Sequence, residues 1–399
     1  MKKLLLLGGL RYLIPVIKTA QQMGVYVITC DYFPNNIAHK YSDEYHNLSI
    51  LDKEAVLVLA KELKIDGIMS FAVDPGVTTA AYVSEKLNLP SAGPYESIKI
   101  LQNKGLFRNF LEKRDFNVPK SRTYTNMEDA IHEFDNFELP VIVKPVDSAG
   151  SKGVMKVNSK NELSRSIQNA LEFSASNTII IEDFLESKTY ASDSDSFSVN
   201  GVFTFTSFSD QRFDPKSPNP YTPSAYSWPS SISEENQVFL KDELQRLIQL
   251  LKMKSSIYNI EVRETTSGKA YIMEVSPRGG GNRLSEMLKF ATGTDLITLA
   301  IQAALGEEIT EVQQPKYNGS WAEIILYSYE TGVFKELFID PKLNENIKEI
   351  DLWVKEGDKV NAFTGANEAI GVLVLKFKDT MTLDSILADY TKYIKVLLN

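Results

Sequence analysis

Two glutamates that face each other across a predicted β-hairpin constrain this chain more than any other feature of its sequence. Residues 258–264 and 270–275 alternate apolar and polar side chains, as strands with one buried face do. The residues between them are typical of a turn and include Gly268, which can adopt a positive φ. The register that follows places Glu261 directly opposite Glu274. Like charges in this position repel each other, so the pattern favours a divalent cation that converts the repulsion into coordination.

The loop of this hairpin has two alternative forms that give the same register. A two-residue loop at Ser267 and Gly268 and a four-residue loop at 266–269 both keep the glutamates paired, and both place Asn259 opposite Ser276. The Cβ atoms of such a pair lie about 4.5–5.5 Å apart, which suits two carboxylates that share one or two metal ions. Magnesium prefers one or two carboxylates together with waters and substrate phosphates. We therefore expect Mg²⁺ here, with Mn²⁺ as the alternative metal.

The segment directly after the hairpin is suited to a phosphoryl group in transfer. Pro277 ends the ladder of hydrogen bonds because it has no N–H. Arg278, the expected catalytic residue, offers a rigid fork of donors, and the glycines at 279–281 allow backbone N–H groups to close around an anion. The residues expected to contact the substrate here are Gly279, Gly280, Asn282 and Arg283. A surface hairpin with solvated glutamates and a flexible loop is the alternative interpretation.

The spacing N-x-E on one strand and E-x-N-P-R on the next resembles the metal-binding hairpin of the ATP-grasp ligases. Biotin carboxylase, the carboxylating enzyme of purine synthesis and the carbamoyl phosphate synthetase large chain belong to that family. This chain has NIE at 259–261 and EVSPR at 274–278. The resemblance implies that Glu261, Glu274 and Ser276 are the metal ligands. Ser276 stands where the family usually has Asn, and its oxygen has a shorter reach.

The composition argues against several classes of function. The formal charge of −9 and the lack of a basic stripe argue against a nucleic-acid partner. A single cysteine, Cys30, excludes a disulfide framework and a cysteine-based zinc site. The apolar run after Met1 is too short for a signal peptide, and none elsewhere reaches membrane-spanning length. We therefore expect a cytoplasmic enzyme, and a chain of 399 residues predicts two or three domains.

Strands and helices alternate over residues 1–94, which predicts βαβ units and a parallel sheet. The strands are expected at 3–7, 25–31 and 67–71, and the helices before Met23 and at 55–63 and 78–87. Gly8 and Gly9 do not make a dinucleotide fingerprint, because the spacing G-x-G-x-x-G is absent. Asp74 follows the third strand, at the edge where open sheets bind ligands. It is either a substrate-binding residue or the N-cap of the next helix.

Two lysines and a glycine-rich loop are expected to bind a nucleotide. A helix predicted over 95–114 carries Lys104, which the family resemblance places on the phosphates of ATP. Lys144 lies at the end of an apolar strand at 139–145, a costly position unless the ammonium group meets an anion. The small residues of the next loop, 146–154, resemble the ATP-grasp glycine-rich loop and do not form a Walker motif. The loop residues expected around the phosphates are Ser148, Ser151 and Gly153.

A second apolar strand, 178–181, leads into the segment that the resemblance identifies as the adenine hinge. The residues expected to contact adenine are Glu182, Asp183, Phe184 and Leu185. The family usually follows this hinge with Gly-x-Glu, whose glutamate holds the ribose. This chain has SKTY at 187–190 instead, so the ribose acid is either missing or displaced to Glu186.

The remaining sequence predicts the domain organisation. Residues 212–231 are rich in proline, serine and aromatic residues, and we expect them to form a long loop that acts as a lid or linker. Helices are expected at 234–252, 283–291 and 295–305, with alternating strands after Tyr317 and a terminal helix from Leu383. The expected class is α/β, with a parallel βαβ domain at 1–94, an ATP-grasp core of two α+β subdomains at 95–310 and a small C-terminal α+β domain at 311–399.

The resemblance implies an ATP-dependent ligase that joins a carboxylate to an amine or a thiol. ATP phosphorylates the carboxylate, and the nucleophile then displaces phosphate from the acyl phosphate, so ADP and phosphate are released. The expected partners are small-molecule carboxylate and amine substrates, and neither a nucleic acid nor a membrane is expected. The candidate assembly is a homodimer. A nucleotide-binding regulatory protein that kept the fold and lost catalysis is the alternative.

Overall fold

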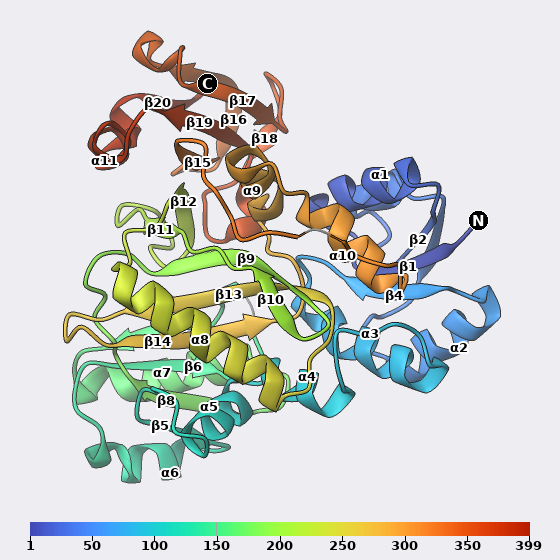
Figure 1. Cartoon of the computed structure of the whole chain (residues 1–399). Coiled ribbons are helices and arrows are strands. Elements are labelled where there is room, and N and C mark those ends of the chain that lie inside the picture. The colour runs from blue at the N-terminus through green and yellow to red at the C-terminus, as the bar shows by residue number, and fades with distance from the viewer. Residues whose placement is uncertain (149, 311) are drawn as a thin grey trace. The chain divides into compact units, whose positions relative to one another are not determined.

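The computed structural model describes residues 1–148, 150–310 and 312–399, and the chain divides into two compact units (Figure 1). The first unit consists of Met1–Thr123, Ser194–Ser207 and Ser233–Pro315. The second unit consists of Tyr124–Asp193, Phe208–Ile232 and Lys316–Asn399. The domain boundaries near residues 94 and 310 remain predictions from the sequence.

The N-terminal part of the first unit is a parallel α/β layer, as predicted. Its strands lie in the order β3-β2-β1-β4, and each neighbouring pair is parallel. The strands are β1 (Lys3–Leu7), β2 (Tyr26–Asp31), β3 (Glu44–Asn47) and β4 (Gly67–Ser70), and the helices are α1 (Ile14–Gln22), α2 (Lys53–Leu63) and α3 (Asp74–Leu87). Because β1 and β4 are neighbours, the loops at their carboxyl ends lie side by side, where open sheets bind ligands.

The rest of the first unit contains a sheet in the order β10-β9-β13-β14. The strands are β9 (Ser192–Val199), β10 (Val202–Phe205), β13 (Ser256–Glu264) and β14 (Ala270–Ser276). The helices are α4 (Tyr95–Leu101), α5 (Lys104–Glu112), α8 (Glu234–Leu250), α9 (Leu284–Thr292) and α10 (Leu296–Ala304). Helix α8 packs on β10 and β14 (Figure 1), and its buried residues recur every three or four positions, as in an amphipathic helix.

The hairpin β13–β14 has the predicted pairing of its glutamates, but it reaches that pairing by an unpredicted route. The Thr265 N–H donates to the Lys269 carbonyl, so the turn is one residue out of the predicted register. A β-bulge at Met273 then adds one residue to β14 and restores the register. Glu261 therefore lies opposite Glu274, as predicted.

The predicted helix over 95–114 is in fact two helices. Helix α4 ends at Leu101, and α5 begins at Lys104. Between them, Asn103 has an extended backbone, and its side chain accepts a hydrogen bond from the Leu106 N–H at 3.0 Å. Such an N-cap begins a new helix. Lys104 therefore occupies the first position of a helix rather than the middle of one.

The second unit contains sheets in the orders β5-β8-β6-β7, β11-β12-β15-β19-β17 and β18-β16-β20. The strands of the first sheet are β5 (Ser121–Tyr124), which leads into this unit, β6 (Val141–Pro145), β7 (Met155–Val157) and β8 (Ile179–Asp183). The remaining strands are β11 (Asp210–Phe213), β12 (Pro223–Trp228), β15 (Ser320–Leu326), β16 (Gly332–Ile339), β17 (Ile347–Leu352), β18 (Lys359–Val360), β19 (Gly371–Phe377) and β20 (Ile394–Leu398). The helices are α6 (Met127–His132), α7 (Lys160–Glu172) and α11 (Thr380–Leu387).

The loop predicted at 212–231 is shorter in the structure. Its two ends belong to β11 and β12, which pair with each other, and residues 214–222 form the connection between them; β12 also pairs with β15. The pairing of Ala225 with Ile324 joins residues that lie far apart in the sequence, so local composition does not reveal it. The helix predicted from Leu383 exists as α11, but the chain continues beyond it into β20.

Candidate functional site

The two hairpin glutamates lie beside two cationic side chains. Lys104 Nζ is 3.2 Å from Glu274 Oε2, and an Arg263 nitrogen is 3.7 Å from Glu261 Oε1. Burial lowers the pKa of Lys104, but the charges of Glu274 and Asp74 outweigh burial, and the net shift is upward. About a third of each carboxylate side chain is exposed, 32% for Glu274 and 36% for Glu261, so an ion from solvent can reach both.

Arg278 forms a bidentate ion pair with Asp74. Its Nε donates to Asp74 Oδ1 at 2.8 Å and its Nη2 to Asp74 Oδ2 at 2.7 Å, while its Nη1 donates to the Gly279 carbonyl at 3.0 Å. Burial raises the pKa of Asp74, but Arg278 outweighs burial, and the net shift is downward. Asp74 is the first residue of α3, and Val73 occupies the N-cap position, so the N-cap interpretation of Asp74 was wrong.

Ser276 is buried and already has two polar partners. Gln102 Nε2 donates to Ser276 Oγ at 2.8 Å, and Ser276 Oγ donates to Asp74 Oδ1 at 3.0 Å. Gln102 lies in the break between α4 and α5, which sequence reasoning did not foresee. The geometry therefore favours Glu261 and Glu274 over Ser276 as ligands of a metal.

A metal ion at the hairpin would need ligands beyond the protein. Over residues 1–148, 150–310 and 312–399, no group of three or more His, Cys, Asp or Glu side chains is arranged to hold a metal. Two carboxylates completed by waters and substrate phosphates are the ligand set that Mg²⁺ prefers. The donor set at Glu261 and Glu274 fits that mode of binding.

The triple-glycine segment is closely packed, contrary to the flexible-loop interpretation. A Cβ on Gly279 would lie 2.2 Å from the Phe71 ring, and one on Gly280 would lie 2.9 Å from Asp195 Oδ1. The Gly279 carbonyl also accepts a hydrogen bond from the Ala72 N–H at 3.0 Å. The close approach of neighbouring groups is therefore what requires glycine here.

Asn282 and Arg283, the other residues expected to contact substrate, have strained backbones. Their φ angles are +51° and +61°, a region that residues with a Cβ rarely adopt. Asn282 Oδ1 accepts a hydrogen bond from the Tyr12 hydroxyl at 3.0 Å. Arg283 donates from Nε and Nη2 to Glu286 Oε1 at 3.1 and 2.9 Å. A substrate contact at Asn282 and Arg283 remains a prediction from the sequence.

Asp195 on β9 is a residue of this region that the sequence analysis did not select. Its carboxylate is fully buried and accepts hydrogen bonds from the Gly280 N–H at 2.8 Å and from the Ser285 hydroxyl at 2.5 Å. Burial raises the pKa of Asp195 to about 6, against the effect of these hydrogen bonds and of the Arg278 charge. The signal in the sequence was an acidic residue inside the strand SDSDSFSV, where an unpaired carboxylate would be costly.

In the second unit, Lys144 meets an anion, as its place at the end of an apolar strand requires. Its ammonium group pairs with the Glu182 carboxylate, and both side chains are largely buried. The Glu182 side chain, expected at adenine, is therefore bound to Lys144. Lys156 Nζ lies over the Phe184 ring, 3.7 Å from the ring centroid. Lys156 was not among the residues expected from the sequence. Asp183 is the last residue of β8, and Leu185 lies just beyond the end of this strand.

The predicted glycine-rich loop adopts left-handed backbone conformations. The φ angles of Gly150, Ser151 and Gly153 are 66°, 58° and 72°. Ser148 is described, whereas Ala149, which belongs to the predicted loop, lies outside the described residues. A Cβ on Gly150 would have no neighbouring atom within 4 Å, so this glycine faces open space.

We predict that the amides of residues 150–154 exchange rapidly with solvent in the absence of nucleotide and slowly with Mg-ATP bound. The reason is that Gly150 faces open space and Lys152 is exposed, whereas phosphate oxygens would accept hydrogen bonds from this segment. Hydrogen–deuterium exchange with and without Mg-ATP measures this effect. The turn at residues 355–359 serves as the internal control and should not respond. Equal protection of 150–154 in both states would contradict the prediction.

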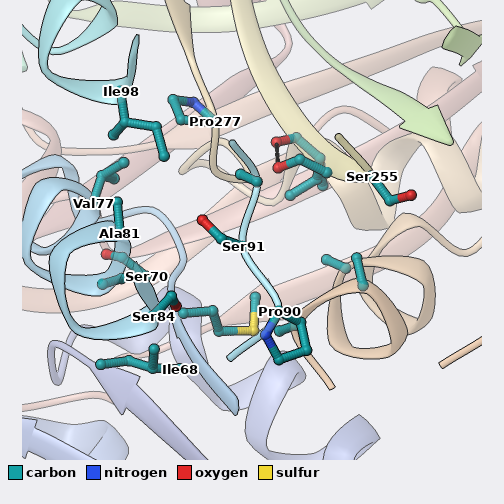
Figure 2. Close-up of a pocket in the computed structure, with 18 residues that line it drawn as sticks. Ile68, Ser70, Val77, Ala81, Ser84, Pro90, Ser91, Ile98, Ser255 and Pro277 are labelled. Atoms are coloured by element: carbon teal, nitrogen blue, oxygen red, sulfur yellow. Dashed lines mark hydrogen bonds between the residues drawn. The ribbon is translucent and has the colours of Figure 1, made fainter. Parts of the chain in front are cut away.

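A cavity of ≈ 60 Å³ in the first unit is lined in part by Pro277, which stands between Ser276 and Arg278 in the chain (Figure 2). Its lining combines apolar side chains, such as Val77, Ile98 and Pro277, with the five serines Ser70, Ser84, Ser91, Ser255 and Ser256. None of the 18 described residues that line it carries a charge. It therefore does not suit a nucleotide, whose phosphates require cations and N–H donors.

Among the described helices, none combines the length and the apolar character that a membrane span requires.

Comparisons with known proteins agree with this architecture. Residues 137–286 match the model of a family described as the ATP-grasp domain. The carbamoyl phosphate synthase large chain of Clostridium perfringens (strain 13 / Type A) is 23% identical over 325 residues, which cover 79% of this chain and 28% of that relative. This chain therefore spans less than a third of the length of that relative.

Two solved structures have the same fold over the whole chain. The L-amino acid ligase from Bacillus licheniformis has a TM-score of 0.80 at 19% identity, covering 100% of this chain and 99% of that chain. The phosphoribosylglycinamide synthetase from Anaerococcus prevotii has a TM-score of 0.77 at 21% identity, covering 100% of both chains. The likeness confirms the predicted fold class, an N-terminal parallel sheet followed by mixed α+β parts.

Proposed function

Because this chain carries an ATP-grasp domain, matched over residues 137–286, we propose that it is an ADP-forming ligase that joins a carboxylate to an amine or a thiol. One observation supports this more than any other: the first unit brings together Glu261, Glu274, Lys104 and the Asp74–Arg278 pair. Two carboxylates for a metal, beside a lysine and an arginine, meet the electrostatic demands of phosphoryl transfer. The similar solved structures include a ligase and a synthetase.

We assign a divalent cation, Mg²⁺, to Glu261 and Glu274. These carboxylates are opposed across the hairpin and accessible, so coordination positions remain for waters and phosphate oxygens. When bound, the ion would neutralise charge on the phosphate oxygens. Lys104 adds a second positive charge at Glu274, and its raised pKa keeps it protonated at neutral pH.

Arg278 is proposed to bind the phosphoryl group or the carboxylate that receives it. Asp74 holds the guanidinium group in a fixed plane through two parallel hydrogen bonds. The lowered pKa of Asp74 makes it a poor general base at neutral pH, so its proposed role is to orient Arg278. In the second unit, Lys144, Lys156 and the loop containing Ser148, Ser151 and Gly153 are proposed to bind the nucleotide.

We predict that turnover releases ADP and phosphate rather than AMP and pyrophosphate. A metal held by Glu261 and Glu274 suits the outer phosphates, and Arg278 follows directly in the chain, so the acceptor belongs beside the terminal phosphoryl group. Chromatography of the nucleotide products, with a panel of amino acids and small carboxylates, measures the outcome. Parallel reactions contain Mg²⁺, Mn²⁺ or a chelator, and the chelated reaction should yield no ADP. AMP as the main product would refute the acyl-phosphate route.

A second candidate function is a nucleotide-binding protein without ligase activity. The observation in its favour is that Arg278 is bound to Asp74 and Ser276 to Gln102, so both already have partners inside the protein. Binding of ATP without ADP release, across the full panel of carboxylates and amines, would favour this candidate. Release of ADP that depends on one carboxylate would exclude it.

A further inference from the structure

A single buried carboxylate connects three segments of the proposed acceptor region. Asp195 Oδ1 accepts hydrogen bonds from the Gly280 N–H at 2.8 Å and from Asn259 Nδ2 at 3.4 Å, and its Oδ2 accepts one from the Ser285 hydroxyl at 2.5 Å. These donors lie on the triple-glycine segment, on β13 and in the first turn of α9. Burying a carboxylate is costly unless donors satisfy it, and these three do so.

Gly280 fits this arrangement because it has no side chain. A Cβ at this position would lie 2.6 Å from Leu284, 2.8 Å from Asn259 and 2.9 Å from Asp195. The backbone of the glycine segment is thus in direct contact with the carboxylate. A hydrogen bond from a backbone N–H to an ionised carboxylate is shorter and stronger than one between neutral groups.

The position of Gly280 affects its neighbours on the side of Arg278. The Gly279 carbonyl accepts hydrogen bonds from Arg278 Nη1 and from the Ala72 N–H, both at 3.0 Å. A shift of Gly280 would move this carbonyl and therefore the guanidinium group that it helps to orient. The negative charge of Asp195 also attracts Arg278. Asp195 thus acts on Arg278 through the backbone and through its charge.

We propose that Asp195 is a positioning residue, which fixes the triple-glycine segment and through it Arg278 in the geometry that the acceptor carboxylate requires. The expected effect of Asp195 on catalysis rests on the proposed ligase function. Whether its carboxylate holds residues 279–285 in place can be measured without any substrate. Misplacement by about 1 Å of groups that bind a reacting substrate can lower the rate about 100-fold.

Two substitutions at Asp195 test the proposal. Asp195→Ala removes the acceptor of the Gly280 N–H, and we expect kcat/KM for the carboxylate to fall about 100-fold while ATP affinity stays within about twofold. Asp195→Asn keeps the size and one acceptor oxygen but loses the charge, so we expect a loss of about tenfold. Hydrogen exchange of residues 279–285 should become faster in both variants, and more so in Asp195→Ala than in Asp195→Asn. Wild-type exchange of residues 279–285 and wild-type kcat/KM for the carboxylate in both variants would overturn the proposal.

A control variant separates positioning from a loss of stability. Ser198→Ala lies on the same strand and removes a buried hydroxyl that donates to the Lys254 carbonyl. We expect it to lower the melting temperature without changing kcat/KM for the carboxylate or the exchange of residues 279–285. An equal fall of kcat/KM for the carboxylate in Ser198→Ala would contradict a specific role for Asp195. If wild-type protein turns over no carboxylate, the ligase function fails, and the exchange data alone decide whether Asp195 holds the glycine segment.

Discussion

Replacing Glu274 with glutamine is expected to lower the kcat of magnesium-dependent ATP turnover by at least about 100-fold. The amide has the size of the carboxylate but no charge, so Glu261 alone would face the metal. Loss of one preorganised group that stabilises transition-state charge costs about 3–4 kcal/mol in the barrier where it has been measured by mutation, and we expect a similar loss here. The apparent affinity for Mg²⁺, measured from turnover against metal concentration and from Mn²⁺ binding, should fall in parallel.

The same substitution should change the free energy of unfolding very little without metal. It removes the repulsion between residues 274 and 261, but it also removes the attraction between Glu274 and Lys104 at 3.2 Å. Both side chains of that ion pair are partly exposed, so each effect is about 1 kcal/mol or less. Thermal melting in chelator measures this. An unfolded Glu274→Gln protein would show that the pair is structural.

A matched control for this experiment is Glu243→Gln. Glu243 also loses an ion pair when neutralised, because it binds Arg246 on α8 at 2.7 Å. It lies outside the site, so the metal dependence and kcat should stay at the wild-type values. Equal loss of activity in Glu243→Gln and Glu274→Gln would refute a special role for the hairpin carboxylates.

The pairing of the glutamates was predictable from the sequence because strand alternation is local information. The loop register was nevertheless wrong by one residue, and the bulge at Met273 restored it. A bulge has no reliable sequence signal in a strand of this kind. The alternation of β13 and β14 placed Glu261 and Glu274 correctly because both must lie on one face of the hairpin.

Other parts of the site depend on partners that are distant in the sequence. The strands β11 and β12 could not be inferred from residues 212–231, because β12 is completed by β15, about a hundred residues later. Asp195 was overlooked for the same reason: its donors, Gly280 and Ser285, come some 85–90 residues further along the chain. The break before Lys104 did have a local signal, the N-cap residue Asn103, which the helical pattern of 95–114 obscured.

Replacing Arg278 with lysine is expected to lower kcat by about 100-fold or more while leaving nucleotide affinity nearly unchanged. Lysine keeps the positive charge, so a purely electrostatic role would survive. It cannot form the two parallel hydrogen bonds to Asp74 and the third to Gly279 that fix the guanidinium plane. The decisive measurements are kcat, the carboxylate KM and the binding of a fluorescent ATP analogue.

Asp74→Asn, combined with Arg278→Lys in a double-mutant cycle, shows whether the two residues act as one unit. The asparagine can still accept from Arg278 but supplies no charge, so we expect kcat to fall and the protein to lose stability, because a largely buried guanidinium loses its counter-charge. If Asp74 orients Arg278, the double variant should be little worse than the worse single variant, since each breaks the same pair. Additive losses would mean that the residues act independently. A gain in carboxylate affinity in Asp74→Asn would instead show that Asp74 competes with the substrate for Arg278, and the orienting role would then be wrong.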